Sequence, residues 1–254
     1  WRDLAAARGI GSKALWRIAG YLAGRGKTAS WLLENPGKLT DALGISKAGF
    51  QAPDFAGREN GEAEKFPGRE VTLLHPLHPD FPRRISILQD RQSLPALLYV
   101  RGNIAILDRP GVAIVGMRQA GEAALAAAAA LAGDLAARGV NVVSGYAAGI
   151  DTAAHIAALS SGGTTTAVLA EGIHHFQTRL ELANHLTVDN ILVVSQFDPD
   201  ARWAGYMAMT RNKLVGALAD ALVVIISGLE RGTGGRHSGT FAAAVSALAM
   251  GIPV

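Results

Sequence analysis

Residues 112–118 read Val-Ala-Ile-Val-Gly-Met-Arg, a short apolar run that ends in a glycine and an arginine. An alanine-rich stretch over residues 121–138 follows, and then a second apolar run, Val140–Val143. A continuous apolar run of this length is typical of a strand buried on both faces, and the stretch between the two runs is long enough for a helix. The order strand, helix, strand predicts two parallel strands joined by a crossover helix, the repeating unit of α/β folds.

The same alternation continues towards the C-terminus. Further strands are predicted at Thr166–Leu169, Ile191–Val194 and Ala221–Ile226. Further helices are predicted at Thr152–Leu159, Phe176–His185, Met207–Leu218 and Thr240–Met250. We therefore predict an α/β fold with a Rossmann-like, doubly wound, mostly parallel sheet. The last residues, Gly251–Val254, resemble the opening of one more strand, so we expect this sequence to be a truncated piece of a longer chain.

Outward from this region, the N-terminal part of the chain has a different character. Residues 1–50 predict a small all-helical domain of the SAM or helix-hairpin-helix type, with helical patterns at Lys13–Ala23, Trp31–Leu33 and Leu39–Leu43. Residues 51–70 are rich in Gly, Pro and Glu, which predicts a linker. Residues 71–254 form the predicted extended Rossmann-like domain, which begins with strands at Val71–Leu74 and Ala96–Val100.

The composition excludes several classes of protein. Of 254 residues, 49% are hydrophobic and 18% are charged, which favours a sizeable core. The net charge of +3, with eight Lys or Arg against three acids in residues 1–50, permits a polyanionic partner. The absence of cysteine excludes disulfides and Cys-based zinc sites. Neither a signal peptide nor a membrane-spanning run is found, so we expect a cytoplasmic protein without a membrane partner.

Glycines follow nearly every predicted strand of the α/β region. They are Gly116 after the first strand, Gly145 and Gly149 with Ser144 after the second, Gly172 after the third, and Gly232, Gly234 and Gly235 after the fifth. A glycine there lets backbone N–H groups approach an anion, and the carboxyl ends of parallel strands meet at one edge. Alternatively, each glycine only relieves a tight turn. The convergence of four such loops favours a phosphate-binding edge.

Basic residues accompany these loops. Arg118 follows the first strand, and Arg211, Asn212 and Lys213 are expected to open a helical segment just before the fifth strand. A guanidinium group can donate two parallel hydrogen bonds to a phosphate, so Arg118 and Arg211 are predicted to bind anions. Arg138 and Arg179 are interpreted instead as solvated helix residues.

Neighbouring side chains have simpler interpretations. Asp151 is expected to cap the helix that follows Gly149. Ser144 is expected either to contact a ligand or to bond the adjacent turn. His155, one turn into that helix, is expected to have a packing role.

Other chemistry finds no support in the sequence. The first strand-to-helix turn lacks the GxGxxG pattern of dinucleotide-binding proteins. Gly26-Lys27-Thr28 resembles the end of a P-loop, but Tyr21 occupies the position of the first glycine of that motif. The pairs His75/His78 and His174/His175 lack a third ligand, and no GxSxG nucleophile motif occurs. We therefore predict no catalytic residue, no metal and no cofactor.

One short motif in the N-terminal zone has two interpretations. Arg8-Gly-Ile-Gly-Ser-Lys-Ala14 resembles the hairpin of a helix-hairpin-helix module, in which glycine amides contact a DNA phosphate. The other interpretation is an ordinary helix N-terminus.

Two longer motifs resemble the DNA processing protein A family, DprA or Smf. Val112–Arg118 is similar to its V-A-I-V-G-x-R strand, and Val143-Ser-Gly-Tyr-Ala-Ala-Gly-Ile-Asp-Thr-Ala-Ala-His155 is similar to its S-G-x-A-x-G-I-D-x-x-A-H loop. Leu97–Gly102 and His78–Ile85 resemble the segment before its Rossmann fold, and Arg211-Asn-Lys213 resembles its R-N-[RK] element. The resemblance covers nearly the whole chain.

The resemblance implies a non-enzymatic protein that binds single-stranded DNA, loads the RecA recombinase during natural transformation and forms homodimers through the Rossmann domain. It also implies that Gly116, Arg118, Ser144, Gly145, Gly149, Arg211 and Lys213 line a phosphate-binding pocket. The chain departs from the family at Met117 and at Gly232–Thr240, which replaces S-G-S-L-x-T-A, and so looks like a divergent branch.

Two alternatives keep the same fold. One is a sensor that binds a free nucleotide. The other is a nucleoside-monophosphate phosphoribohydrolase, whose P-G-G-x-G-T-x-x-E loop Gly232–Thr240 resembles loosely. Ala242–Ala244 follow at the positions where that loop needs a glutamate, so the general acid/base is missing.

Overall fold

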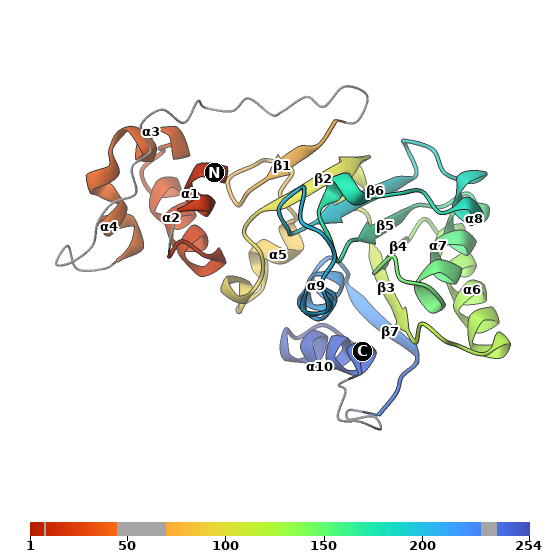
Figure 1. Cartoon of the computed structure of the whole chain (residues 1–254). Coiled ribbons are helices and arrows are strands. Elements are labelled where there is room, and N and C mark those ends of the chain that lie inside the picture. Colours follow the sequence, from red (N-terminus) through yellow and green to blue (C-terminus); the bar gives the residue numbers. More distant parts are fainter. Residues whose placement is uncertain (8, 45–69, 230–237) are drawn as a thin grey trace.

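The computed structural model describes residues 1–7, 9–44, 70–229 and 238–254 and contains a seven-stranded sheet (Figure 1). The strands are β1 (Thr72–Leu74), β2 (Leu98–Gly102), β3 (Gly111–Gly116), β4 (Asn141–Ser144), β5 (Thr165–Val168), β6 (Ile191–Ser195) and β7 (Ala221–Ile226). Their order across the sheet is β1-β2-β6-β5-β4-β3-β7. Neighbours from β6 to β7 pair in parallel, whereas β1 and β2 add an antiparallel edge.

Helices cover both faces of this sheet (Figure 1). In the α/β region they are α5 (Arg83–Ile87), α6 (Glu122–Ala137), α7 (Ile150–Ser160), α8 (Leu180–Ala183), α9 (Gly205–Ala217) and α10 (Gly239–Ala249). Helices α6 and α7 pack on one face, and α9 and α10 pack on the other. The predicted doubly wound α/β fold is thereby confirmed.

Strand alternation decides which side chain meets which layer. In β3, Ile114 packs with α6 and α7, whereas Ala113 and Val115 belong to the cluster that includes α9 and α10. In β4, Val142 packs with α6 and α7, whereas Val143 belongs to the cluster on the opposite face. Since successive side chains of a strand point to opposite faces, a strand covered on both faces must be apolar throughout. This is why the apolar runs located the strands correctly.

The N-terminal segment is helical, as predicted. It contains α1 (Arg2–Ala6), α2 (Ser12–Ala23), α3 (Ala29–Glu34) and α4 (Leu39–Leu43). Its apolar side chains are continuous with the core beside the sheet: Trp16 Nε1 donates a hydrogen bond to Leu94 O at 3.2 Å, and the Trp16 ring meets Phe81 edge-on. The division at 1–50, 51–70 and 71–254 stays a prediction, and most of the predicted linker lies outside the described residues.

One predicted helix is wrong. Residues 176–185 contain only the single-turn α8, and residues 177–179 before it have no helical structure. Tertiary contacts hold this segment: the Tyr146 hydroxyl donates to Gln177 O and accepts from the Arg179 backbone N–H, each at 3.0 Å. Phe176 is buried in a cluster with Ala167 of β5 and Val193 of β6. These contacts override the local helical pattern.

Asp220, the residue before β7, joins this strand to α5 through an ion pair and to the beginning of β3 through a hydrogen bond. Arg84 on α5 donates two hydrogen bonds to Asp220, both at 2.7 Å, and others to the carbonyl oxygens of Leu107 and Arg109. Asp220 also accepts from the Gly111 N–H at 2.8 Å. The bonds from Arg84 and Gly111 lower the pKa of the Asp220 carboxyl below its ordinary value of 3.8.

We expect Asp220→Ala to lower the free energy of unfolding by about 1–2 kcal/mol, because bidentate charge-assisted bonds are lost at a half-exposed site. The depressed pKa makes this contribution complete above pH 3.8 and removes it as the pH falls through the lower folded-state value. Urea unfolding at pH 7 and at decreasing pH measures it. Asp41→Ala, which breaks the exposed pair with Lys38, is the matched control and should change stability by less than about 0.5 kcal/mol. An equal effect of both variants would contradict the prediction.

Candidate anion-binding site

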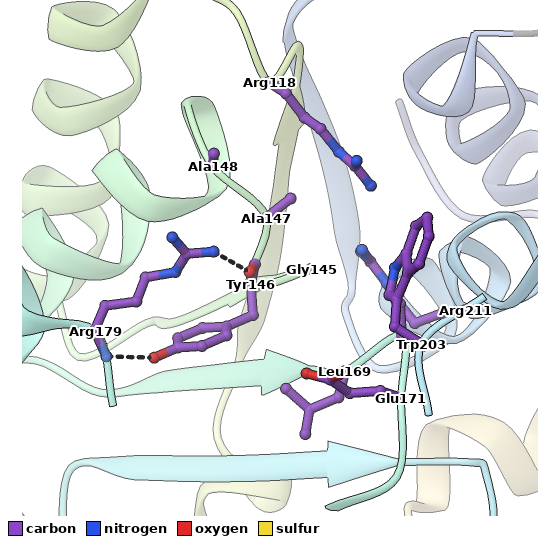
Figure 2. A pocket seen from close by; sticks show the side chains of 11 residues that line it. Arg118, Gly145, Tyr146, Ala147, Ala148, Leu169, Glu171, Arg179, Trp203 and Arg211 are labelled. Atoms are coloured by element: carbon purple, nitrogen blue, oxygen red, sulfur yellow. Dashed lines mark hydrogen bonds between the residues drawn. The ribbon is translucent and has the colours of Figure 1, made fainter. Parts of the chain in front are cut away.

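A cavity of about 320 Å³ opens at the carboxyl ends of β3, β4, β5 and the segment after β6 (Figure 2). Its lining consists of Arg118, Gly145, Tyr146, Ala147, Ala148, Leu169, Ala170, Glu171, Arg179, Trp203 and Arg211. Three of these residues are arginines and one is a glutamate. The pocket therefore has a positive balance at the sheet edge where α/β folds bind ligands.

Arg211 is the most deeply placed of the three arginines. Its side chain comes from α9 and is only 5% exposed, yet it lines the pocket (Figure 2). The guanidinium lies against Gly145, where a Cβ atom would overlap its Nη1 atom. Gly145 is thus required for the close approach of a side chain, a different reason from the predicted approach of its own amide to an anion. The Arg211 Nε atom is buried and finds no hydrogen-bond partner among the described residues.

Asp151 is the buried counter-charge behind this guanidinium. Its carboxylate accepts a hydrogen bond from the Ala147 N–H at 3.2 Å, and Arg211 and Asp151 interact electrostatically. Burial raises the pKa of Asp151, and the positive charge of Arg211 opposes that rise. The expectation of an N-cap is wrong, because Gly149 occupies the cap position and Asp151 lies within the first turn of α7. Its carboxylate fixes the 145–149 loop.

The other two arginines are more exposed than Arg211. Arg118 is exposed, and Figure 2 shows its side chain pointing towards the part of the pocket that holds Arg211. The charge of Arg118 contributes to lowering the pKa of Arg211, behind the larger effect of burial. The interpretation of Arg179 as a solvated helix residue is wrong. Arg179 is partly buried, donates from Nη2 to Tyr146 O at 3.0 Å and lies 5.1 Å from the centre of the Tyr146 ring.

Some predicted residues support the pocket without lining it. A Cβ atom at Gly116 would overlap the Ile150 side chain, so this glycine lets α7 pack on β3. Ser144 is fully buried and donates to Ile114 O at 2.6 Å, which joins β4 to β3. Gly149 has φ +79° and lies against the carbonyl oxygens of Met117 and Arg118. These three residues set the shape of the two loops.

The remaining predicted residues lie elsewhere. Asn212 donates from Nδ2 to Gly239 O at 2.9 Å and so joins α9 to α10. Lys213 is exposed on α9 and does not line the pocket. Gly232, Gly234 and Gly235 lie outside the described residues.

His155 packs beneath the site, as expected. Its Nδ1 atom lies 2.6 Å from Thr165 Oγ1, and burial lowers its pKa to about 3. The ring is therefore neutral at physiological pH and is enclosed by the fold.

The sequence did not single out Trp203 or Glu171. Trp203 lies between β6 and α9, where residues 196–204 contain no glycine, so a search for glycine-rich loops passes over it. Its signal was a tryptophan in a polar loop containing Asp198, Pro199 and Asp200, after a strand that points to the same edge. Glu171 adds one carboxylate to a lining that holds three arginines.

The fold and the pocket together define a class: Rossmann-like α/β proteins with a positively charged pocket at the carboxyl ends of the parallel strands. Residues 72–254 match the family model described as DNA recombination-mediator protein A. The chain belongs to this family, and the resemblance to DprA/Smf is confirmed.

Relatives of known sequence agree. The putative DNA processing protein DprA of Mycobacterium tuberculosis is 39% identical over 142 residues, which are 56% of this chain and 36% of that protein. The DNA processing protein DprA of Streptococcus pneumoniae is 31% identical over 174 residues, which are 68% of this chain and 58% of that protein. The chain therefore spans only part of the length of these relatives.

Solved structures show the same fold. The crystal structure of DprA from Streptococcus pneumoniae superposes with a TM-score of 0.72 at 25% identity and covers 96% of this chain and 80% of that one. A DprA structure from Helicobacter pylori, described for its single-stranded DNA binding mode, superposes with a TM-score of 0.59 at 27% identity and covers 72% and 79%. Within the described residues, no helix is both long and apolar enough to cross a membrane.

Proposed function

We propose that this chain binds single-stranded DNA and holds a backbone phosphate between Arg211 and Arg118. The observation that carries the proposal is Arg211, which is buried and charged and yet lines an open pocket. Burying a charged group is costly unless it is paired and hydrogen-bonded. Asp151 supplies the opposite charge within the fold, and a phosphate in the pocket would supply hydrogen-bond acceptors to the part of the guanidinium that lines it.

Single-stranded DNA fits the open side of this site better than a small free anion does. Arg118 is exposed at the mouth, so its guanidinium can follow a backbone that continues beyond the pocket. The structure of the Helicobacter pylori relative is described for single-stranded DNA binding, which supports the same ligand class here. Phosphate contacts of this kind bind without regard to base sequence and weaken with salt.

The cellular role follows the family. We propose that the chain acts in DNA processing during natural transformation, in the cytoplasm and without catalysis, and that it helps to load the RecA recombinase. Support comes from the family match and from the DprA relatives. The test is whether the chain accelerates filament formation by purified RecA on DNA that is coated with single-strand-binding protein. No acceleration would remove this role while leaving DNA binding in place.

The expected homodimer through the Rossmann domain also stays a proposal. Helix α10 presents Phe241, Val245 and Leu248 to solvent at helical spacing on one face. Such a stripe is typical of a helix that packs against another surface. Sedimentation velocity at micromolar concentration would show a dimer, and a monomer at all concentrations would contradict it.

The nucleotide-sensor alternative has one observation in its favour: a pocket of about 320 Å³ is within the range of small-ligand sites. Competition distinguishes it from the DNA proposal. If a free mononucleotide displaces labelled oligo-dT at a concentration comparable with that of the oligonucleotide, the pocket is a nucleotide site. If the mononucleotide competes only at a large excess, affinity comes from several linked phosphates.

We expect Arg118→Ala to weaken binding of a labelled oligo-dT several-fold and to reduce the steepness of the salt dependence. Each neutralised phosphate contributes about 0.7 to the slope of log K against log salt for single strands, so the slope should fall by about that amount. Fluorescence anisotropy across a salt series measures both. Arg138→Ala is the matched control, because Arg138 is exposed at the C-terminal end of α6, at the opposite edge of the sheet. An unchanged slope in Arg118→Ala would contradict the proposed contact.

A further inference from the structure

The segment between β6 and α9 brings a large aromatic surface to the pocket. Trp203 lines the cavity although its side chain is 55% exposed. Figure 2 shows the indole in the part of the pocket towards which Arg118 points, and Arg211 lines the same pocket. The core does not explain this position, because Trp203 belongs to none of the three buried clusters. An exposed tryptophan at the mouth of a binding pocket points to a ligand surface.

Several hydrogen bonds fix the segment that carries this indole. The Gly172 N–H donates to Ala201 O at 2.7 Å, and the His174 N–H donates to Pro199 O at 3.1 Å. The His174 ring nitrogen Nδ1 lies 2.8 Å from the Asp200 carboxylate. The backbone leading to Trp203 is thus ordered before any ligand binds, which lowers the entropic cost of using the indole as a contact surface.

The other aromatic residues near the pocket are already engaged. Tyr146 lines it, but its hydroxyl bonds to the 177–179 segment and its ring packs against His155 and Phe176. Phe241 is on α10 and does not line the pocket. Among the described pocket residues, Trp203 therefore offers the accessible ring.

We propose that Trp203 stacks on the base of the nucleotide whose phosphate Arg211 holds. This inference rests on the proposed DNA binding and adds a residue that contacts the flat face of a base. Stacking on an indole is available to all four bases, so Trp203 would add affinity for nucleotides without selecting a sequence. Arg118 and Arg211 would hold the backbone, and Trp203 would hold the base, within one pocket.

The test separates base from backbone with two labelled probes of equal length, about 20 residues. One is oligo-dT, and the other has the same phosphodiester backbone with abasic tetrahydrofuran in place of every nucleoside. We expect Trp203→Ala to weaken oligo-dT binding about tenfold and to change abasic binding less than about twofold. Trp203→Phe should keep most of the oligo-dT affinity. Equal losses on both probes, or no loss on oligo-dT, would overturn the proposal.

A second readout follows the indole itself. Oligo-dT should quench the tryptophan emission of the wild-type chain, the abasic probe should quench it far less, and Trp203→Phe should abolish the difference. Tyr206→Ala is the matched control, since Tyr206 is an aromatic residue of α9 that is 66% exposed and does not line the pocket. It should leave binding of both probes unchanged. Quenching by oligo-dT that persists in Trp203→Phe would overturn the assignment.

The abasic probe also keeps the two proposals apart. Suppose that the wild-type chain binds the abasic probe in a salt-dependent manner and that Arg211→Gln weakens this binding. The phosphate-binding proposal is then supported independently of the result for Trp203. If wild-type chain binds neither probe, DNA binding itself fails and the stacking role fails with it.

Discussion

Arg211→Gln is expected to weaken binding of oligo-dT by tenfold or more, the largest loss of affinity among single substitutions in the pocket. Hydrogen bonds to a charged group contribute about 1.5–3 kcal/mol each, and this guanidinium is shielded from water. Glutamine is shorter and uncharged, so it cannot reach the phosphate with two parallel bonds. Fluorescence anisotropy at fixed salt measures the affinity.

The same substitution removes the partner of a buried carboxylate. Asp151 would be left without the positive charge that interacts with it, so we also expect the free energy of unfolding to fall by about 2–4 kcal/mol. The double variant Arg211→Gln with Asp151→Asn separates the two effects. It removes both charges, so stability should recover substantially while DNA affinity stays low. Recovery of DNA affinity in the double variant would show that Arg211 acts through the fold alone.

Gly149→Ala is expected to lower the free energy of unfolding by about 2–4 kcal/mol, as much as Arg211→Gln. Gly149 has φ +79° and ψ −125°, a combination that residues with a Cβ atom rarely adopt. A Cβ atom there would also lie 2.6 Å from Met117 O and overlap Arg118 O, and backbone atoms yield little. Urea unfolding measures the loss, which should appear as a lower midpoint with an unchanged slope. DNA affinity should fall as well, because both loops of the pocket must move.

Gly139→Ala isolates the contribution of backbone strain. Gly139 has φ +74°, but a Cβ atom there would meet nothing within 4 Å. Its loss should be about 1–2 kcal/mol, the usual cost of a left-handed conformation, and DNA affinity should not change. If the two alanine variants lose the same stability, the close packing of the loops around Gly149 contributes nothing.

The strands illustrate how far a local pattern can determine a fold. The sheet is covered on both faces, so Ile114 must be as apolar as Ala113 and Val115, and the run is visible without knowledge of its partners. The same reasoning fails between residues 176 and 185. There the hydroxyl of Tyr146, distant in sequence, bonds the backbone on both sides of Thr178 and prevents the helix that the pattern predicts.

Some residues of the pocket could likewise be predicted from the sequence, and others could not. Arg118, Gly145 and Arg211 were predicted from the sequence, because glycines and arginines at strand and helix ends are typical of phosphate sites, and the structure brings these three together. The predicted position of Arg211 at the start of a helix is wrong, because it lies in the middle of α9. Arg179 was misjudged because its environment depends on Tyr146, and Trp203 was missed because a rigid loop without glycine gives no such pattern.

By itself, then, the sequence determined the order of most strands and helices, the edge of the sheet at which the pocket lies and the family, since each depends on residues close together along the chain. Only the tertiary structure decided that Gly145 makes room for Arg211, that Asp151 balances this guanidinium and that the exposed Trp203 lines the same pocket. These relations join residues from the loop after β4, from α7, from α9 and from the loop before α9. Their side chains meet only because parallel strands end at the same edge of the sheet, so the packing of the whole domain sets the distances between them.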